Sequence, residues 1–210
     1  MARFGMVIDT TKCVGCMDCV VACKTENDVP DGFCRDWIVE EVKGRMPDLS
    51  MEIRSERCNM CDDPPCVYCC PTGASHVEDF GQLVQIDADK CIGCKACLAA
   101  CPYGARYTHP DGYADKCTFC VHRLKEGKRP ACVSVCPTHC MYFGDLDDAN
   151  SEVNRLLNAR PHKSVLDEAG TRPRIDGRRD LLCNINIDFI DTAILNVRCD
   201  SAHSIFNKRE

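Results

Sequence analysis

Cysteine gives this sequence its chemistry, because sixteen of its 21 cysteines fall into four groups of four. Groups one and three have the spacing C-x2-C-x2-C-x3-C, group two widens the middle gap to four residues, and group four widens it to eleven. The groups are Cys13, Cys16, Cys19 and Cys23; Cys58, Cys61, Cys66 and Cys70; Cys91, Cys94, Cys97 and Cys101; and Cys117, Cys120, Cys132 and Cys136. A proline follows the last cysteine of groups two, three and four. Such spacing is typical of thiolates that hold [4Fe-4S] clusters, so we expect four clusters that carry electrons and no catalytic side chains.

Two other uses of cysteine fit this spacing less well. Paired C-x2-C motifs also build structural zinc sites, but group one places all four ligands within residues 13–23, which is a poor match for two separated zinc knuckles. Group four, with its gap of eleven residues, is the group most like a zinc knuckle. Disulfides need a set Cα separation and a rotated S–S torsion, and densely spaced cysteines on tight loops do not provide them.

The charge balance bounds the class of partner. The chain has 26 basic and 32 acidic residues, a net charge of −6, and each oxidised cluster with four thiolates adds roughly −2. A chain with four clusters would carry about −14, which disfavours nucleic acid and anionic membrane surfaces as partners and favours docking to proteins. The sequence has no run of 18 apolar residues, no signal-peptide pattern and no twin-arginine pair at its start, so we expect a soluble chain without an address of its own.

An internal repeat appears when the sequence is compared with itself at a shift of 78 residues. In each copy a short apolar run, residues 4–8 or 83–86, ends in an aspartate and a turn, as expected of a strand that leads into a ligand loop. Gly15 and Gly93 follow at equivalent places, where they let the backbone approach inorganic sulfur closely. Helix-compatible segments at 17–24 and 95–100 then carry the fourth cysteine one turn further on.

The remaining segments are predicted from local patterns. Residues 28–56 form an insertion with a strand at 37–39, and residues 103–116 form a hairpin around Pro110, Asp111 and Gly112. Val153, Leu156 and Leu157 mark an amphipathic helix that starts near Asp147 or Asn150. Later segments are predicted as a polar turn at 176–179 and an alternating run at 185–190, suited to an edge strand or a partner-binding arm.

Five cysteines and three lysines near the ligands receive structural interpretations. Cys69 and Cys140 are expected to be small buried fillers, while Cys34, Cys183 and Cys199 are expected to be free thiols. Lys12, Lys90 and Lys116 each precede the first cysteine of a group. We expect these lysines to be solvated charges.

With the four groups in hand, the chain resembles the iron-sulfur electron-transfer (beta) subunits of the DMSO reductase or molybdopterin oxidoreductase family, which serve polysulfide, arsenate and tetrathionate reductases among others. The resemblance covers about residues 3–175 and includes residues 6–9, 22–27, 101–106 and 143–146. It implies an α+β, loop-rich fold of two bacterial-ferredoxin-like [4Fe-4S] modules with short β-hairpins and short helices. The outer module would comprise residues 1–56 with 103–145, the inner module residues 57–102, and residues 146–210 a C-terminal helix and partner-binding tail.

The same resemblance implies that paired groups exchange their fourth cysteines. Groups one and four would share one pair of clusters, and groups two and three the other. The implied ligand sets are Cys13, Cys16, Cys19 and Cys136 for cluster 1; Cys117, Cys120, Cys132 and Cys23 for cluster 2; Cys58, Cys61, Cys66 and Cys101 for cluster 3; and Cys91, Cys94, Cys97 and Cys70 for cluster 4.

The resemblance also implies the partners. It predicts electron transfer between a large catalytic subunit, which holds a molybdenum or tungsten bis-pterin cofactor, and a membrane subunit that reacts with quinone in anaerobic respiration. Export together with the catalytic subunit would place the chain on the outer, periplasmic face of the cytoplasmic membrane; a cytoplasmic location is the alternative. Two other functions stay open: a soluble partner of a formate dehydrogenase, hydrogenase or transhydroxylase, and an iron-sulfur assembly or sensor protein.

Overall fold

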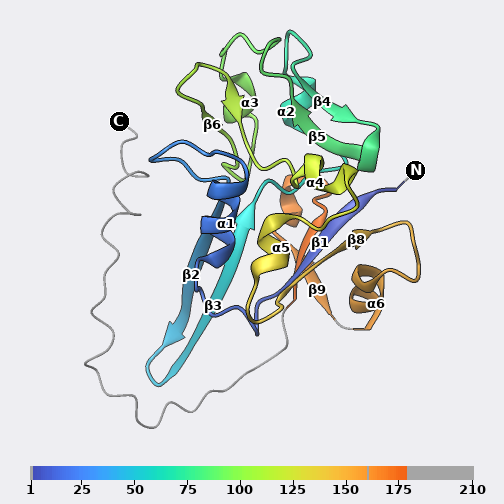
Figure 1. Cartoon of the computed structure of the whole chain (residues 1–210). Helices are drawn as coiled ribbons and strands as arrows, with labels where there is room; N and C mark the ends of the chain where they lie inside the picture. The colour runs from blue at the N-terminus through green and yellow to red at the C-terminus, as the bar shows by residue number, and fades with distance from the viewer. Residues whose placement is uncertain (1, 160, 179–210) are drawn as a thin grey trace.

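The computed structural model describes residues 2–159 and 161–178. Within these residues the largest sheet has four strands, in the order β8-β1-β10-β9 (Figure 1). Strand β1 lies at its centre, antiparallel to β8, with Met6 opposite Phe143, and parallel to β10, with Met6 opposite Ile175. The strands span β1 Phe4–Asp9, β8 Met141–Asp145, β9 His162–Ser164 and β10 Ile175–Arg178. Because β1 is paired on both sides, its residues from Gly5 to Asp9 are buried.

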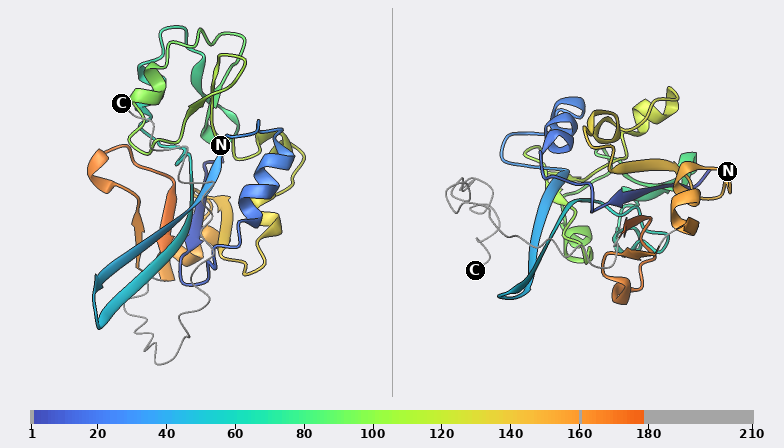
Figure 2. Two further views of the ribbon diagram at one scale, coloured as in Figure 1. Left: turned by 90° about the vertical axis from the view of Figure 1, so that its left-hand side faces the viewer. Right: turned by 90° about the horizontal axis from the view of Figure 1, so that it is seen from below.

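Three antiparallel hairpins surround this sheet. The hairpin β2-β3 is the longest, and Figures 1 and 2 show it extending away from the rest of the molecule. The strands are β2 Asp36–Arg45, β3 Asp48–Arg57, β4 Ser75–Glu78, β5 Leu83–Ile86, β6 Tyr107–Thr108 and β7 Ala114–Asp115. The predicted strand at 37–39 and the predicted hairpin around Pro110–Gly112 are therefore confirmed, although β2 is much longer than predicted.

The helices are short, and five of them carry or border the cysteine groups. They are α1 Asp18–Glu26, α2 Pro65–Tyr68, α3 Ala96–Ala99, α4 Val121–Lys125, α5 Ala131–Val135 and α6 Glu152–Ala159, with short 3-10 turns at Phe80–Gln82 and Asp167–Ala169. Helix α1 packs against α5, and α2 packs against α3. Helix α6 is the predicted amphipathic helix, and its buried Val153 lies against Gly144 of β8. None of these helices is long and apolar enough to cross a membrane.

The 78-residue repeat is visible in the backbone. Gly15 and Gly93 both have φ of 67°, a left-handed conformation that favours glycine. The residues before α1 and α3, Met17 and Lys95, also match, with φ of 64° and 63°. The two copies thus share strand, ligand loop and helix start, which confirms the expected local structure of the repeat.

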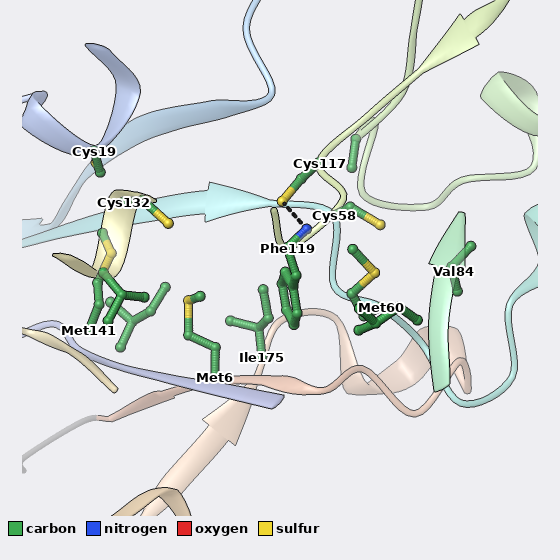
Figure 3. Close-up of a cluster of buried hydrophobic side chains, with 14 of the residues drawn as sticks. Met6, Cys19, Cys58, Met60, Val84, Cys117, Phe119, Cys132, Met141 and Ile175 are labelled. Carbon is green, nitrogen blue, oxygen red and sulfur yellow. Dashed lines mark hydrogen bonds between the residues drawn. The ribbon is translucent and has the colours of Figure 1, made fainter. Parts of the chain in front are cut away.

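The core holds few large apolar side chains and many sulfur atoms. Figure 3 shows Met6, Met60 and Met141 packed with Phe119, Ile175 and several of the group cysteines. Aromatic residues are only 6% of the chain, so thiol and thioether groups fill space that aromatic rings fill in many proteins. The expectation of a mixed, loop-rich α+β fold is confirmed.

The predicted polar turn at 176–179 is wrong. Residues 175–178 instead form β10, which pairs with β1 at Val7 opposite Asp176 and with β9 at Ser164 opposite Asp176. The backbone hydrogen bonds of this strand, supplied by distant segments, override the turn preference of the Asp-Gly pair. The segment at 185–190, Cys183 and Cys199 lie outside the described residues.

Strand β10 should be essential for stability, because Ile175 is buried in the core beside β1. We predict that Ile175→Ala lowers the free energy of unfolding by about 2–5 kcal/mol, from lost burial and the cavity left behind. Leu166→Ala, at a side chain in the same segment that is 39% exposed, should change it by less than about 0.5 kcal/mol. The measurement is the guanidinium midpoint under anaerobic conditions, and equal midpoints for the two variants would contradict the assignment of β10.

Candidate metal centres

Four cavities are each lined by four of the sixteen group cysteines. The space among their lining atoms, part of it open to solvent, is about 270 Å³ in cavity 1, 310 Å³ in cavity 2, 310 Å³ in cavity 3 and 340 Å³ in cavity 4. The lining cysteines are Cys13, Cys16, Cys19 and Cys136 in cavity 1; Cys23, Cys117, Cys120 and Cys132 in cavity 2; Cys58, Cys61, Cys66 and Cys101 in cavity 3; and Cys70, Cys91, Cys94 and Cys97 in cavity 4. Each cavity thus takes three cysteines from one group and the fourth from another.

Short helices bring the fourth cysteine of a group to the cavity next to the one lined by its other three cysteines. Cys19 and Cys23 are one turn apart on α1, and they line cavities 1 and 2. Cys132 on α5 and Cys136 at its end line the same two cavities in the opposite order. Four residues of helix rise by about 6 Å, so one helix can serve two adjacent cavities. Helices α2 and α3 connect cavities 3 and 4 in the same way.

All four ligand loops share one backbone feature. The second residue after the first cysteine has a positive φ in every group: 67° at Gly15, 46° at Met60, 67° at Gly93 and 54° at Phe119. Met60 and Phe119 are fully buried, so packing offsets the strain of a non-glycine residue in this conformation. We infer that the same ligand loop occurs four times, with glycine in groups one and three and a core residue in groups two and four.

The cavities differ in their access to solvent. The cysteines of cavity 2 are all buried, and in cavity 3 only Cys101 is half-buried. Cavities 1 and 4 instead have the exposed cysteines Cys16 and Cys94. Beside these lie Val14 and Ile92, which are 61% and 67% exposed. Cavities 1 and 4 therefore each have a small exposed apolar surface next to one of their thiols.

The cavities form a row from cavity 1 to cavity 4. Figure 3 shows Cys19, Cys132, Cys117 and Cys58 in that order across the core, which covers cavities 1, 2 and 3. Cys58 of cavity 3 is near enough to Cys117 of cavity 2 to oppose its ionisation. Arg106 lines both cavity 3 and cavity 4, so these two cavities adjoin. The two most buried cavities are thus the two in the middle.

The donor set fits clusters of several atoms. In the described part of the chain, no three Cys, His, Asp or Glu side chains converge as the ligands of one metal ion would. Instead, four group thiols line each cavity. Burial raises the pKa of Cys117 and of Cys132 to about 12, and the Arg57 guanidinium opposes this rise in both. Buried thiolates of this kind need strong positive charge beside them, which iron supplies when it binds.

Arg57 and Arg106 donate to equivalent cysteines in the two halves of the row. The Arg57 guanidinium donates to Cys132 Sγ in cavity 2 at 3.1 Å, and that of Arg106 donates to Cys66 Sγ in cavity 3 at 2.9 Å. Each also donates to a serine, Ser55 for Arg57 and Ser75 for Arg106. One buried nitrogen of each guanidinium, Arg57 Nε and Arg106 Nη1, has no hydrogen-bond acceptor among the described residues. These nitrogens lie on residues that line the cavities, so they suit the sulfide and thiolate acceptors of a bound cluster.

The prediction that Lys116 is a solvated charge is wrong. Lys116 is 1% exposed. Its Nζ donates hydrogen bonds to the carbonyl oxygen of Val84 and, at 2.7 Å, to that of Cys117. The sequence held a signal for this, since a basic residue precedes the first cysteine of all four groups. Lys90 at this position is exposed, as expected, whereas Arg57 is buried like Lys116. Arg57 was missed because its neighbours in sequence are polar and charged, so only the pairing of β3 reveals its burial.

The cysteines outside the groups have different environments. Cys140 is buried, as expected, and it also lines cavity 1, with its Sγ 3.4 Å from Cys136 Sγ. Hydrogen bonding to the Cys140 thiol lowers the pKa of Cys13 below its usual value. Cys69 is half-buried, so its predicted role as a buried filler is wrong, and Cys34 is an exposed free thiol, as expected.

Comparison with known proteins gives consistent relatives. A family model described as a 4Fe-4S dicluster domain matches residues 49–146. The chain is 44% identical over 176 residues to Protein NrfC of Escherichia coli (strain K12), covering 82% of this chain and 79% of that protein. It is 41% identical over 177 residues to the B subunit of polysulfide reductase of Wolinella succinogenes, covering 82% and 92%. It is 45% identical over 166 residues to the thiosulfate reductase electron transfer subunit PhsB of Salmonella typhi, covering 75% and 83%.

These similarities extend over most of the chain and most of each relative, and the family model spans cysteine groups two, three and four. They agree with the resemblance drawn from the spacing of the cysteines. The cysteine-lined cavities and the match to a 4Fe-4S dicluster domain together indicate a protein that binds iron-sulfur clusters. The chain belongs to the iron-sulfur electron-transfer subunits of the molybdopterin oxidoreductase family.

Proposed function

We propose that this chain holds four [4Fe-4S] clusters in two ferredoxin-like modules, one in each cavity. The observation that carries the proposal is that each cavity is lined by four group cysteines, with every group cysteine used once. The ligands of clusters 1 to 4 are then the cysteines of cavities 1 to 4. A [4Fe-4S] cluster supplies a one-electron redox change at its iron and sulfide atoms. The protein contributes the thiolates, the hydrogen bonds to sulfur and the exclusion of water.

The two ends of the row are the proposed sites of electron entry and exit. Cys16 and Cys94 are the exposed thiols of cavities 1 and 4, and Val14 and Ile92 form apolar contacts beside them that a docked protein could cover. No group cysteine in the middle of the row is exposed, so electrons should leave at the two ends, where a partner is docked. This arrangement suits a subunit that connects two different proteins.

The proposed partners are a large catalytic subunit with a molybdenum or tungsten bis-pterin cofactor and a membrane subunit that reacts with quinone. The printed names of the relatives support the first partner, since the polysulfide reductase B subunit and the thiosulfate reductase electron transfer subunit are parts of reductases. We further propose that the chain works on the periplasmic face of the membrane, exported with its catalytic partner. Proteolysis of intact spheroplasts tests that location: the chain should be digested, and complete protection would instead favour a cytoplasmic role.

Iron analysis is the first test of the four-cluster proposal. Protein purified without oxygen should contain about sixteen irons and about sixteen acid-labile sulfides per chain, because each cluster holds four of each. Metal and sulfide assays measure both. Eight irons or fewer, or zinc in stoichiometric amount, would show that the cavities hold something else.

The exchange of fourth ligands is tested by Cys136→Ser. Although Cys136 belongs to group four, it lines cavity 1, so the variant should lose or alter the cluster bound by Cys13, Cys16 and Cys19. Electron paramagnetic resonance of the reduced protein measures which signal changes. Cys140→Ala, at a thiol next to Cys136 that is not a proposed ligand, is the matched control and should keep about sixteen irons. Loss of only the cluster bound by Cys117, Cys120 and Cys132 would refute the exchange.

The docking role of the two ends is tested by Val14→Glu and Ile92→Glu. Each variant places a charge on one apolar contact and should slow electron exchange with only one of the two partners, by about tenfold or more, while the iron content stays unchanged. Stopped-flow measurements of cluster reduction by quinol, and of oxidation of the reduced complex by the substrate of the catalytic subunit, follow the two exchanges separately. Met46→Glu should change neither, because Met46 is 81% exposed at the tip of the β2-β3 hairpin, which extends away from the rest of the molecule. Equal rates in all three variants would contradict the proposal.

A further inference from the structure

Three buried cations lie at the three boundaries of the row of cavities. Arg57 reaches Cys132 of cavity 2, and through Ser55 it is linked to Cys19 of cavity 1, whose Sγ is 3.6 Å from the Ser55 hydroxyl. Its positive charge is balanced, because Asp36 forms a buried ion pair with it at 3.2 Å. The first boundary therefore holds an approximately neutral pair.

Lys116 lies at the second boundary, between cavities 2 and 3. Its backbone belongs to the residue before Cys117 of cavity 2, while its Nζ is hydrogen-bonded to Val84 O, which lines cavity 3, and lies 3.9 Å from Met60 Sδ. In the described part of the chain no carboxylate forms an ion pair with Lys116, and its hydrogen-bond acceptors are backbone carbonyls.

Arg106 lies at the third boundary, between cavities 3 and 4. It donates to Cys66 Sγ of cavity 3 at 2.9 Å, and it also lines cavity 4, where it interacts with Cys97. The side chain is buried, and its partners among the described residues are thiols and the hydroxyl of Ser75. Arg106 thus resembles Lys116 in forming no ion pair with a carboxylate of the described residues.

Two buried charges without counter-ions would be strongly destabilising in an empty protein. A buried ammonium or guanidinium normally requires an anion at close range, because removing it from water is costly. The anions available here are the clusters on either side, each of which carries about −2 with its four thiolates when oxidised and one more negative charge when reduced. Lys116 and Arg106 are therefore placed to stabilise the reduced form of the clusters beside them.

We propose that Lys116 and Arg106 are shared electrostatic controls of the reduction potentials, each acting on the two clusters that flank it. Lys116 raises the potentials of clusters 2 and 3 together, and Arg106 raises those of clusters 3 and 4 together. Cluster 3 is consequently the one cluster stabilised by both cations. Lys116 lies at the boundary between the two modules, and its positive charge would stabilise an added electron on the cluster at either side. This inference rests on the proposed occupancy of the four cavities.

The test is a mediated redox titration of the anaerobically purified chain, followed by electron paramagnetic resonance, in Lys116→Met and Arg106→Met. Redox mediators set the solution potential, and each cluster accepts one electron from them. Each variant should lower the reduction potentials of two of the four clusters. We expect a change of about tenfold or more in the ratio of reduced to oxidised cluster at fixed potential, which corresponds to about 59 mV for a one-electron couple. The two affected pairs should have one cluster in common, so the pattern can be recognised without assigning each signal to a cavity.

Two controls separate charge from structure. Lys116→Arg keeps the charge and should restore both potentials toward those of the unmodified protein, whereas a purely structural role would not make the potentials follow the charge. Lys90→Met is the matched surface control, because Lys90 also precedes the first cysteine of a group but is 65% exposed and paired with Asp87 at 2.8 Å. It should leave all four potentials unchanged.

The outcomes are distinct for the two proposals. Fewer than about sixteen irons in the unmodified chain would refute the four-cluster proposal before any titration. With about sixteen irons present, unchanged potentials in both methionine variants, or pairs without a common cluster, would overturn the inference. If Lys116→Met loses iron and Arg106→Met does not, the potentials of the Arg106→Met variant are the test. Lower potentials of two clusters support the inference, and unchanged potentials overturn it.

Discussion

The constraint on which the structure depends is the spacing of two cysteines by one helical turn. Cys19 and Cys23 on α1 are separated by about 6 Å along the helix axis, so they line neighbouring cavities and cannot serve the same one equally well. Cys132 and Cys136 repeat the relation from α5, in reverse order. Each pair of cavities is therefore enclosed by two helices that are distant in sequence and packed together. Bound clusters would connect these helices in the manner of cross-links.

The sequence predicted this local chemistry well, because ligand spacing is a short-range property. The cysteine groups, the repeat, and the strand, glycine loop and helix of each copy follow from residues close to one another in the chain. Strand β10 did not follow, since its partners β1 and β9 belong to other segments and the Asp176-Gly177 pair alone favours a turn. Long-range pairing of this kind is decided by the sheet and leaves little trace in the strand itself.

Burial of charge was the other property that local patterns could not give. Lys90 and Lys116 occupy the same position relative to a cysteine group, yet one is in solvent and the other is enclosed. The difference follows from the second residue after the first cysteine. Gly93 leaves its loop at the surface, whereas Phe119 draws its loop into the core, and Met60 does the same after Arg57. The second residue after the first cysteine thus differs between the ends and the middle of the row. It is glycine in the groups that line cavities 1 and 4, and a buried Phe or Met in the groups that line cavities 2 and 3.

The burial of the cysteines of cavity 2 has a consequence for the order in which the molecule is assembled. Every cysteine of cavity 2 is buried, and Phe119 and Met60 are buried beside the cysteines of cavities 2 and 3. Iron and sulfide would reach these thiols more easily before β1, β8 and β10 come together than after. We therefore expect insertion of the clusters of cavities 2 and 3 to precede the final closure of the sheet. A chain matured in this order would be folded before any export.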